Sequence, residues 1–295
     1  MDLPSLLKEP GLALIIGNGI NRYGNAPHTN SWNDLLVSLA DKHLPASLRS
    51  VPTGISLTEF YDLLELKLPN SSDSRTLQQE FCDLMADWQA YDHHCRIVQW
   101  AKRSQVPILT TNFDEVLSKA GQLRPYRTKK GGFTDYYPWE TYFGECQNND
   151  PARKFGIWHI NGMQRYYRSV RLGLTHYMGS VERARGWLHK GDEERLFSGK
   201  DVRNWVGASS WMHVVFNSPL LIFGIALDEN EVFLRWLLIE RARYFRRFPE
   251  RRRRAWYVYS GDPNSDGKQY FLEGVGIAPI HVEKYEQIYG ETVWN

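Results

Sequence analysis

The sequence of 295 residues is poor in cysteine. Its three cysteines, Cys82, Cys95 and Cys146, are odd in number and far apart, a pattern that indicates no disulfide framework. Because no two of them form a Cys-x-x-Cys pair, a structural zinc site with four cysteine ligands is excluded. The segment His93-His94-Cys95 has side chains of the ligand type, but no second cluster stands at a zinc-like spacing. We therefore expect no metal.

The sequence also lacks a long apolar run and an excess of either charge. No 18-residue apolar run is present, which argues against a transmembrane helix. The first residues, MDLPSLLKEPG, have neither the basic nor the apolar segment of a signal peptide. Lys plus Arg number 36 and Asp plus Glu 34, a formal net charge of +2 that does not favour a dedicated nucleic-acid binder. We expect a cytoplasmic protein without membrane association.

What is present is the pattern of a globular protein. Hydrophobic residues make up 42% of the sequence and charged residues 24%, which excludes wholesale disorder. Short apolar runs predict buried strands at residues 12–16, 106–110, 155–160, 220–223, 256–259 and 276–282. Helical spacing of apolar residues predicts helices at 32–43, 56–68, 75–103 with a break near 90–92, 175–189, 200–216 and 229–247.

The alternation of strands and helices predicts an α/β fold. It is typical of parallel βαβ units, so we expect a Rossmann-like, doubly wound, mainly parallel sheet in a single domain over residues 1–295. Residues 121–154 hold no clear period and are expected to form a loop with at most a short strand. The stretch between the first two strands is too long for one crossover helix, which predicts a helical insertion at about residues 31–104.

Glycine and polar residues follow four of the predicted strands. Gly17-Asn18-Gly19 comes directly after the first strand, where glycine lets the backbone turn tightly and approach a pyrophosphate. The complete dinucleotide fingerprint is absent because Arg22 stands in place of the third glycine. The residues near the other three strand ends are Asn112 and Asp114 after strand 106–110, His159 in strand 155–160, and Gly224 and Asp228 after strand 220–223. Because ligands of doubly wound sheets bind beyond the carboxyl ends of the strands, the residues at all four ends predict one shared crevice.

Five segments in order resemble motifs of sirtuin-like (Sir2-like) proteins. The first resembles their nucleotide loop, the second their Thr-Gln-Asn-Ile-Asp motif and the third the His-Gly motif of the general base. The fourth and fifth resemble a Leu-Thr-x-x-x-Tyr and a Gly-x-Ser-Leu-x-Asp stretch. With their flanking elements they span about residues 12–283. The segments are Leu-Ile-Ile-Gly-Asn-Gly-Ile-Asn (14–21), Thr-Thr-Asn-Phe-Asp (110–114), Trp-His-Ile-Asn-Gly (158–162), Thr-His-Tyr (175–177) and Phe-Gly-Ile-Ala-Leu-Asp (223–228).

Several residues depart from the sirtuin pattern, and these departures narrow the set of sirtuin-like proteins that the sequence resembles. Asn18 and Asn21 replace Ala and Ser of the first loop, Ala226 replaces a Ser, and Asp228 stands one residue early. The four-cysteine zinc module that braces the acyl-peptide cleft of protein deacylases is missing, which counts against deacylation. The sequence instead resembles the sirtuin-like NAD-consuming effectors of bacterial anti-phage defence, such as those of Thoeris and Argonaute-linked systems.

The resemblance implies an NAD hydrolase (NADase) that releases nicotinamide and ADP-ribose and acts in abortive infection. It implies that Asn112 orients a ribose hydroxyl and the attacking water, since its amide both donates and accepts. His159 would be the general base, because its ordinary pKa suits proton removal near neutrality. Asp114 would receive the nicotinamide carboxamide or cap the following helix. The residues implied to bind NAD are Gly17, Asn18, Gly19, Asn21, Thr111, Asp114, Gly224 and Asp228.

We expect the activity of such an enzyme to be regulated, and two other functions remain as alternatives. An uncontrolled NADase would kill its host, so we expect control by a regulatory or sensor protein partner, by assembly into a homo- or hetero-oligomer, or by a small-molecule signal. Eight arginines between Arg241 and Arg254 predict a basic patch for an acidic partner or nucleic acid, or else the solvated end of a helix. The alternative functions are a non-catalytic module that senses NAD or ADP-ribose, and an adaptor that recruits a partner.

Overall fold

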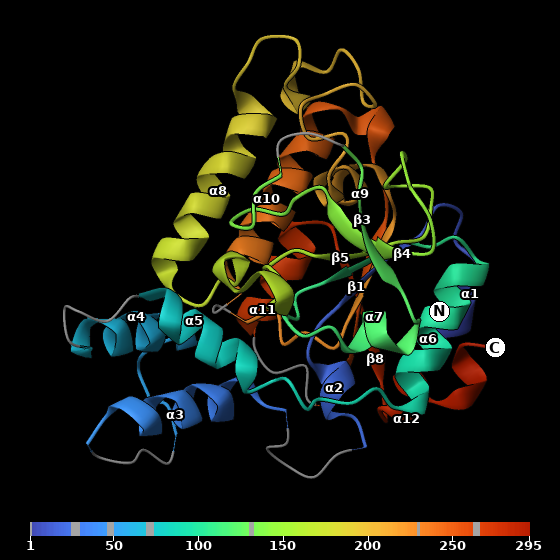
Figure 1. Ribbon diagram of the computed structural model, residues 1–295. Helices are drawn as coiled ribbons and strands as arrows, with labels where there is room; N and C mark the ends of the chain where they lie inside the picture. Colours follow the sequence, from blue (N-terminus) through green and yellow to red (C-terminus); the bar gives the residue numbers. More distant parts are fainter. Residues whose placement is uncertain are drawn as a thin grey trace.

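The computed structural model contains an eight-stranded sheet with helices packed around it (Figure 1). The residues that it describes are 2–24, 30–45, 50–68, 74–129, 133–228, 231–261 and 266–295. The strands are β1 (Ala13–Ile16), β2 (Ile108–Thr110), β3 (Arg124–Arg127), β4 (Thr141–Gly144), β5 (Ile157–His159), β6 (Leu220–Phe223), β7 (Ala255–Ser260) and β8 (Ala278–Val282).

The order of the strands is β3-β4-β5-β2-β1-β6-β7-β8. The six strands from β5 to β8 in this order are parallel, and β3 and β4 join the β5 edge as antiparallel neighbours. Counted along the chain among themselves, the six parallel strands stand in the order 3-2-1-4-5-6. The chain runs outward from β1 through β2 to β5, then crosses back to β6 beside β1 and runs outward again through β7 to β8, so the order reverses between β1 and β6. The predicted α/β fold with a mainly parallel sheet is confirmed.

The side chains of β1 explain why this strand lies at the centre. All four are fully buried, as expected for a strand covered on both faces. Ala13 and Ile15 belong to one apolar cluster and Leu14 and Ile16 to another, because successive side chains of a strand point to opposite faces. The uninterrupted apolar runs of the sequence thus correspond to a sheet with a core on each side.

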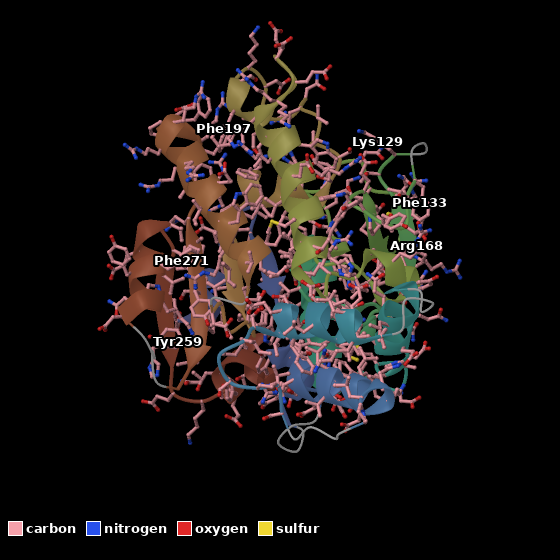
Figure 2. The ribbon with its side chains drawn as sticks, turned by 90° about the vertical axis from the view of Figure 1, so that its left-hand side faces the viewer. Lys129, Phe133, Arg168, Phe197, Tyr259 and Phe271 are labelled. Carbon is pink, nitrogen blue, oxygen red and sulfur yellow. The ribbon has the colours of Figure 1, made fainter. Side chains whose placement is uncertain are left out.

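Helices cover both faces of the sheet. The first cluster contains side chains of α8 (Leu174–His189), α9 (Trp211–Asn217), α10 (Val232–Arg247) and α11 (Asp266–Gly274). Phe197 lies where α8 and α10 run side by side, with its ring centroid 5.5 Å from that of Tyr244 (Figure 2). The second cluster contains side chains of α1 (Leu3–Leu6), α2 (Gly19–Arg22), α6 (Asp92–Arg103), α7 (Val116–Ala120) and α12 (Glu286–Tyr289).

Three of the helices between β1 and β2 form a third apolar cluster with the loop that follows β2. The cluster includes Phe113 and Val116, so these helices pack against the end of the sheet. Ser56 starts the second helix, because its hydroxyl accepts from the Glu59 amide at 3.1 Å and the Glu59 carboxylate accepts from the Ser56 amide at 2.7 Å. The three helices are α3 (Trp32–His43), α4 (Leu57–Lys67) and α5 (Ser74–Asp83).

Most predicted elements are confirmed, and three differ. The helix predicted at 200–216 is wrong over 200–210, where the chain makes turns and bends, because the Ser210 hydroxyl accepts from the Met212 amide and starts α9 there. Residues 121–154 contain two strands rather than a loop. Helix α10 is described from Val232, and the predicted start at residues 229–230 lies outside the described residues. Short 3-10 segments occur at Gln164–Ser169, Leu196–Ser198, Pro249–Arg251 and Glu291–Val293.

No helix within the described ranges is both long enough and apolar enough to cross a membrane. The longest are α8 and α10, with 16 residues each, and a spanning helix needs about 20 predominantly apolar residues. Both helices instead bury one side against the sheet and expose charged side chains on the other.

One glycine within α8 leads to a prediction about stability. An added Cβ at Gly186 would meet nothing within 4 Å, and the residue lies inside a regular helix. Replacing Gly186 with alanine is therefore expected to raise the free energy of unfolding by about 0.5–1 kcal/mol, because alanine restricts the unfolded chain and favours the helix. Chemical denaturation would measure this, and a destabilised variant would contradict it.

Candidate active site

A cavity of about 440 Å³ opens beyond the carboxyl ends of β1, β6 and β7. Its lining includes Trp32, Leu57, Thr111 and Glu231, and the same four residues also line a narrower cavity of about 80 Å³. The narrower cavity reaches Asn161, which follows β5. The two cavities thus form one cleft along the edge of the sheet where the strand order reverses, which is where α/β sheets bind ligands.

Three glycines bring the loops after β1 and β6 into direct contact. The Gly19 amide donates to the Gly224 carbonyl at 2.7 Å. A Cβ on Gly17 would lie 2.3 Å from Cγ1 of Ile225 and 2.6 Å from the Gly224 oxygen, and a Cβ on Gly19 would lie 2.8 Å from the Gly224 Cα. Glycine is required here for the packing of one loop on the other. Gly19 and Gly224 also line the cleft, whereas Gly17 lies against Gly224 and Ile225.

The two residues predicted to be catalytic are in contact. The Nδ1 atom of His159 lies 2.8 Å from the main-chain oxygen of Asn112. Because a carbonyl oxygen only accepts, Nδ1 carries the proton of the neutral ring and Nε2 carries a lone pair. His159 is 3% exposed, and burial lowers the pKa of its imidazole. The ring is therefore held as a neutral base at neutral pH, with Nε2 as the basic atom.

Buried polar atoms without hydrogen-bond partners gather around this contact. They include Nε2 of His159, both amide atoms of Asn112 and Oδ1 of Asn161. Such atoms are rare in folded proteins, and each costs about 1–3 kcal/mol when it is left unsatisfied. All three residues lie within two positions of the ends of β2 and β5. Of these residues only Asn161 lines the cleft; His159 lines a separate cavity of about 20 Å³, which shares Arg171 with the narrower cavity, and Asn112 lies behind both.

Asp114 and Asn21 form a polar network beneath the cleft. One Asp114 oxygen accepts from the Val116 amide at 2.9 Å, and the other accepts from Nδ2 of Asn21 at 2.8 Å. Asn21 Nδ2 also donates to Oδ1 of Asn18 at 2.9 Å, and Asn21 Oδ1 accepts from Nε2 of His94 at 3.0 Å. The Val116 contact is the helix-capping alternative, and Asp114 thereby fixes α2 against α7.

The pKa of Asp114 predicts a dependence of stability on pH. Burial raises the pKa of this carboxyl from 3.8 to about 6. Between these values the folded protein holds a proton that the unfolded chain has lost, so the free energy of unfolding falls as pH rises. The contribution of Asp114 over this window is about 3 kcal/mol.

We expect Asp114→Asn to remove that slope. The buried histidines, including His94 with a pKa lowered to about 3, change stability in the opposite direction in both proteins. The difference between the variant and the parent therefore isolates the carboxyl. Urea denaturation at several pH values from 4 to 7 would measure it, and parallel curves for the two proteins would contradict the assignment.

The predicted NAD-binding residues fall into two groups. Gly17, Asn21 and Asp114 support the cleft from behind through the contacts described above. The residues that line the cleft directly are Asn18, Gly19, Thr111, Gly224 and Asp228.

Sequence reasoning missed two charged residues of the cleft. Glu231 is partly exposed to it, and burial of its carboxyl raises the pKa to about 7. Arg171 is 5% exposed, lines the narrower cavity, and donates from Nε to the Ser180 hydroxyl at 2.9 Å. The signal for Glu231 is its place in the sequence, three positions after Asp228, which follows strand 220–223. Arg171 had no such signal, because it lies in an irregular segment.

Comparison of the chain with family models, with curated proteins and with solved structures finds no match. Within the described part of the chain, no three His, Cys, Asp or Glu side chains are grouped to hold a metal. His93 and His94 instead bond to α2, through the Ile20 oxygen at 2.8 Å and the Asn21 amide.

Proposed function

We propose that the protein is a Sir2-like NAD glycohydrolase that releases nicotinamide and ADP-ribose. The observation that carries the proposal is the pair of Asn112 and His159. Among the described residues, nothing bonds to the two side-chain amide atoms of Asn112 or to Nε2 of His159, and the Nδ1 contact leaves Nε2 as the basic atom. The sequence resemblance to sirtuin-like effectors and the position of the cleft at the reversal of the strand order support the same function.

The chemistry of the bond fits these two side chains. Nicotinamide is cationic in NAD and leaves neutral, so its departure needs no general acid, while the ribose develops oxocarbenium character. What the enzyme must supply is an oriented water and a base that takes its proton. Nε2 of His159 accepts that proton, and the Asn112 amide donates to a ribose hydroxyl and accepts from the water. The water oxygen then bonds to the anomeric carbon as the bond to nicotinamide breaks.

The larger cavity is the proposed place of the ADP part of the substrate. Its volume of about 440 Å³ is of the size that small-molecule sites have. Gly19 and Gly224 let the main chain approach a pyrophosphate there, and Asp228 accepts hydrogen bonds from an adenosine hydroxyl. The narrower cavity reaches Asn161 and Arg171, and Arg171 also lines the small cavity beside His159.

We extend the proposal to the type of α/β fold. The strand order 3-2-1-4-5-6 is that of Rossmann-like, doubly wound sheets. We propose one Sir2-like domain over residues 1–295 in which α3 to α5 form the helical insertion. Helix α6, which was included in the predicted insertion, packs on the sheet with Ile97 and Val98 and serves as the crossover helix to β2.

We further propose that the enzyme is a cytoplasmic effector of abortive infection, controlled by a protein partner or by assembly into an oligomer. An unregulated NADase would empty its own cell of NAD. The arginine-rich stretch between Arg241 and Arg254 is a candidate docking surface for the partner, but Arg241 itself does not belong to that surface. That side chain is 2% exposed and donates to the carbonyls of Val215 and Ser218 at 2.8 and 3.1 Å, which ties α10 to α9.

One assay tests the proposal. The full chain is incubated with NAD, alone and with the product of a neighbouring gene, and free nicotinamide is measured. Release in either mixture is the expected result. Tight NAD or ADP-ribose binding without release, with the partner present, would contradict the hydrolase and identify a sensing module. Binding of neither molecule would leave the adaptor function.

A further inference from the structure

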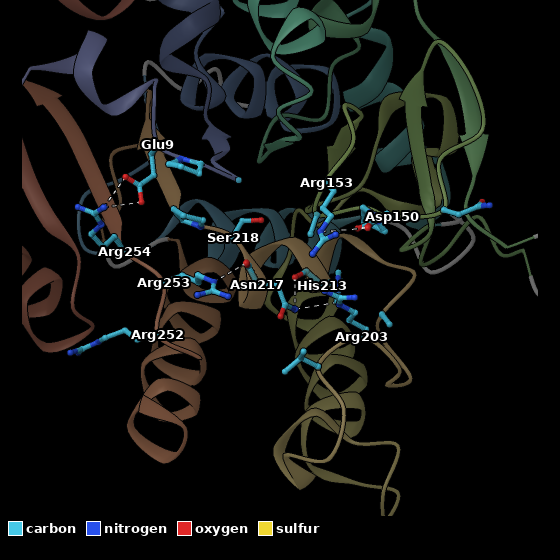
Figure 3. Close-up of a pocket in the computed structure, with 18 residues that line it drawn as sticks. Glu9, Asp150, Arg153, Arg203, His213, Asn217, Ser218, Arg252, Arg253 and Arg254 are labelled. Carbon is cyan, nitrogen blue, oxygen red and sulfur yellow. Dashed lines mark hydrogen bonds and ion pairs between the residues drawn. The ribbon is translucent and has the colours of Figure 1, made fainter. Parts of the chain in front are cut away.

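A second cavity, of about 600 Å³, lies at the opposite end of the sheet (Figure 3). Its lining includes Gly11, Pro219 and Arg254, which immediately precede or closely approach the starts of β1, β6 and β7. The proposed NAD cleft lies beyond the other ends of the same three strands. The two cavities are thus separated by the length of the sheet, and none of the residues discussed for hydrolysis lines the second one.

Arginines dominate the charge of this second cavity. Figure 3 shows Arg252, Arg253 and Arg254 on one side and Arg153 and Arg203 on the other. Five arginines and two carboxylates line the cavity, which leaves a formal excess of three positive charges. These guanidinium groups come from three separate segments, so the fold, and not a single run of sequence, brings them together.

Two of the arginines have a carboxylate within ion-pair distance, and among the described residues the other three have none. Nη2 of Arg254 donates to both carboxylate oxygens of Glu9 at 2.9 and 3.0 Å, and Nε of Arg153 lies 3.9 Å from an Asp150 oxygen. Arg253 donates only to the main-chain oxygen of Asn217, at 3.3 Å. Among the described residues, no carboxylate lies within ion-pair distance of Arg203 or Arg252, and both side chains are exposed.

Between the two sets of arginines, the cavity is lined by buried hydrogen-bonding groups. Ser218 is 1% exposed, and its hydroxyl has no hydrogen-bond partner in the part of the chain that the structure describes. His213 is 7% exposed, and its Nδ1 accepts from the indole of Trp205 at 3.2 Å. The neutral ring therefore carries its proton on Nε2, and burial lowers the pKa of His213, which keeps the ring neutral. The cavity thus offers a hydroxyl and an N–H donor beside guanidinium groups.

We propose that this cavity binds a small molecule with two or more linked phosphates, of the class of nucleoside di- and triphosphates. Guanidinium groups match phosphate oxygens in a bidentate geometry, and an excess of three positive charges suits the charge of such a ligand. Ser218 and His213 donate to phosphate oxygens that enter the cavity. The apolar side chains of the lining, which a sugar or base contacts, are Pro10, Pro151, Ala152, Val202 and Ala208.

The depth of the site favours a compact ligand over a polymer. A nucleic-acid strand or an acidic polypeptide spreads its charges over an extended surface and is met by exposed cations. Here Ser218 is 1% exposed, so a group that bonds to its hydroxyl has to be small enough to enter the cavity. Two further exposed arginines of the same stretch, Arg246 and Arg247, lie on α10 outside the cavity lining. A polymer would use them, and a ligand inside the cavity would not.

These two arginines provide a matched control for the test. The variant Arg203→Gln/Arg252→Gln removes two exposed charges from the cavity, and Arg246→Gln/Arg247→Gln removes two exposed charges beside it. Calorimetric titration of the full chain with inorganic tripolyphosphate is expected to give a dissociation constant below about 100 µM at about 0.15 M salt. The cavity variant is expected to bind at least tenfold more weakly, and the control variant within twofold of the parent. Ser218→Ala is expected to weaken binding several-fold.

Further titrations separate this site from the proposed hydrolase. ATP is expected to compete with tripolyphosphate, and His159→Ala is expected to leave tripolyphosphate binding unchanged, because the inference does not depend on NAD hydrolysis. Equal weakening by both double variants would overturn the proposal, since it would show only general attraction to a basic surface. Binding of poly-glutamate or of an oligonucleotide through Arg203 and Arg252, without binding of tripolyphosphate, would also overturn it.

Discussion

Replacing His159 with alanine is expected to lower the rate of NAD hydrolysis by about 100- to 10,000-fold, the range that general bases contribute. The loss is expected in kcat more than in KM, because His159 acts on the water and not on the ADP part of the substrate. The Nδ1 contact with the Asn112 carbonyl holds the ring so that Nε2 faces away from it.

The control for this variant is His281→Ala. His281 is an exposed histidine of β8, bonded to the Gly261 carbonyl, so its removal is expected to leave activity within twofold of the parent. Asn112→Ala is expected to reduce kcat strongly and to raise KM as well, because the amide also holds the ribose. Thermal unfolding of each variant shows whether the fold is retained. A folded His159→Ala protein with full activity would exclude this residue as the base.

The dependence of kcat/KM on pH provides a second test of His159 as the base. The base must be unprotonated, so kcat/KM is expected to rise with pH and then level off. Because burial lowers the pKa of His159 below its ordinary value of 6.5, the midpoint of the rise is expected below pH 6.5. A midpoint well above 7 would point to a different group.

The central part of the fold could be predicted from local sequence because its strands are covered on both faces. The runs at β1 and β6 are wholly apolar, and all eight of their side chains are buried. Strand β3 has the sequence Arg-Pro-Tyr-Arg and is exposed or half-buried at the sheet edge, so no apolar run marks it. Helix α11 likewise has one buried residue, Leu272. Elements that contribute little to the core leave little pattern in the sequence.

Those residues of the site that lie at the ends of strands could be predicted from the sequence. The sequence predicts Asn112 and His159 at the ends of two strands, and the pairing of β2 with β5 brings them together. The network beneath them could not be derived, because His94 and Asn21 are 73 positions apart and meet only through the packing of α6 on α2. The separation of the second arginine cavity from the cleft also depends on tertiary structure, since Arg153 and Arg203 join it from distant segments.

Gly162→Ala is expected to destabilise the protein by about 2–5 kcal/mol, a large part of the total stability of a typical protein. Gly162 has a φ of +99°, a conformation that costs a residue with a Cβ about 1–2 kcal/mol. A Cβ at this position would also lie 2.1 Å from the Ser169 oxygen and 2.4 Å from its carbonyl carbon. Main-chain atoms cannot rotate away, so the overpacking adds about 1–3 kcal/mol.

Gly191→Ala separates the two contributions. Gly191 also has a positive φ, +87°, but an added Cβ there meets nothing within 4 Å, so only the conformational cost of about 1–2 kcal/mol applies. Chemical denaturation of both variants is expected to show the larger loss for Gly162→Ala, and equal losses would mean that the loop at Ser169 yields to the methyl group. Because Gly162 follows Asn161 directly, a loop that yields would also move the end of β5. The NAD hydrolysis rate of Gly162→Ala then reports whether the position of His159 depends on this turn.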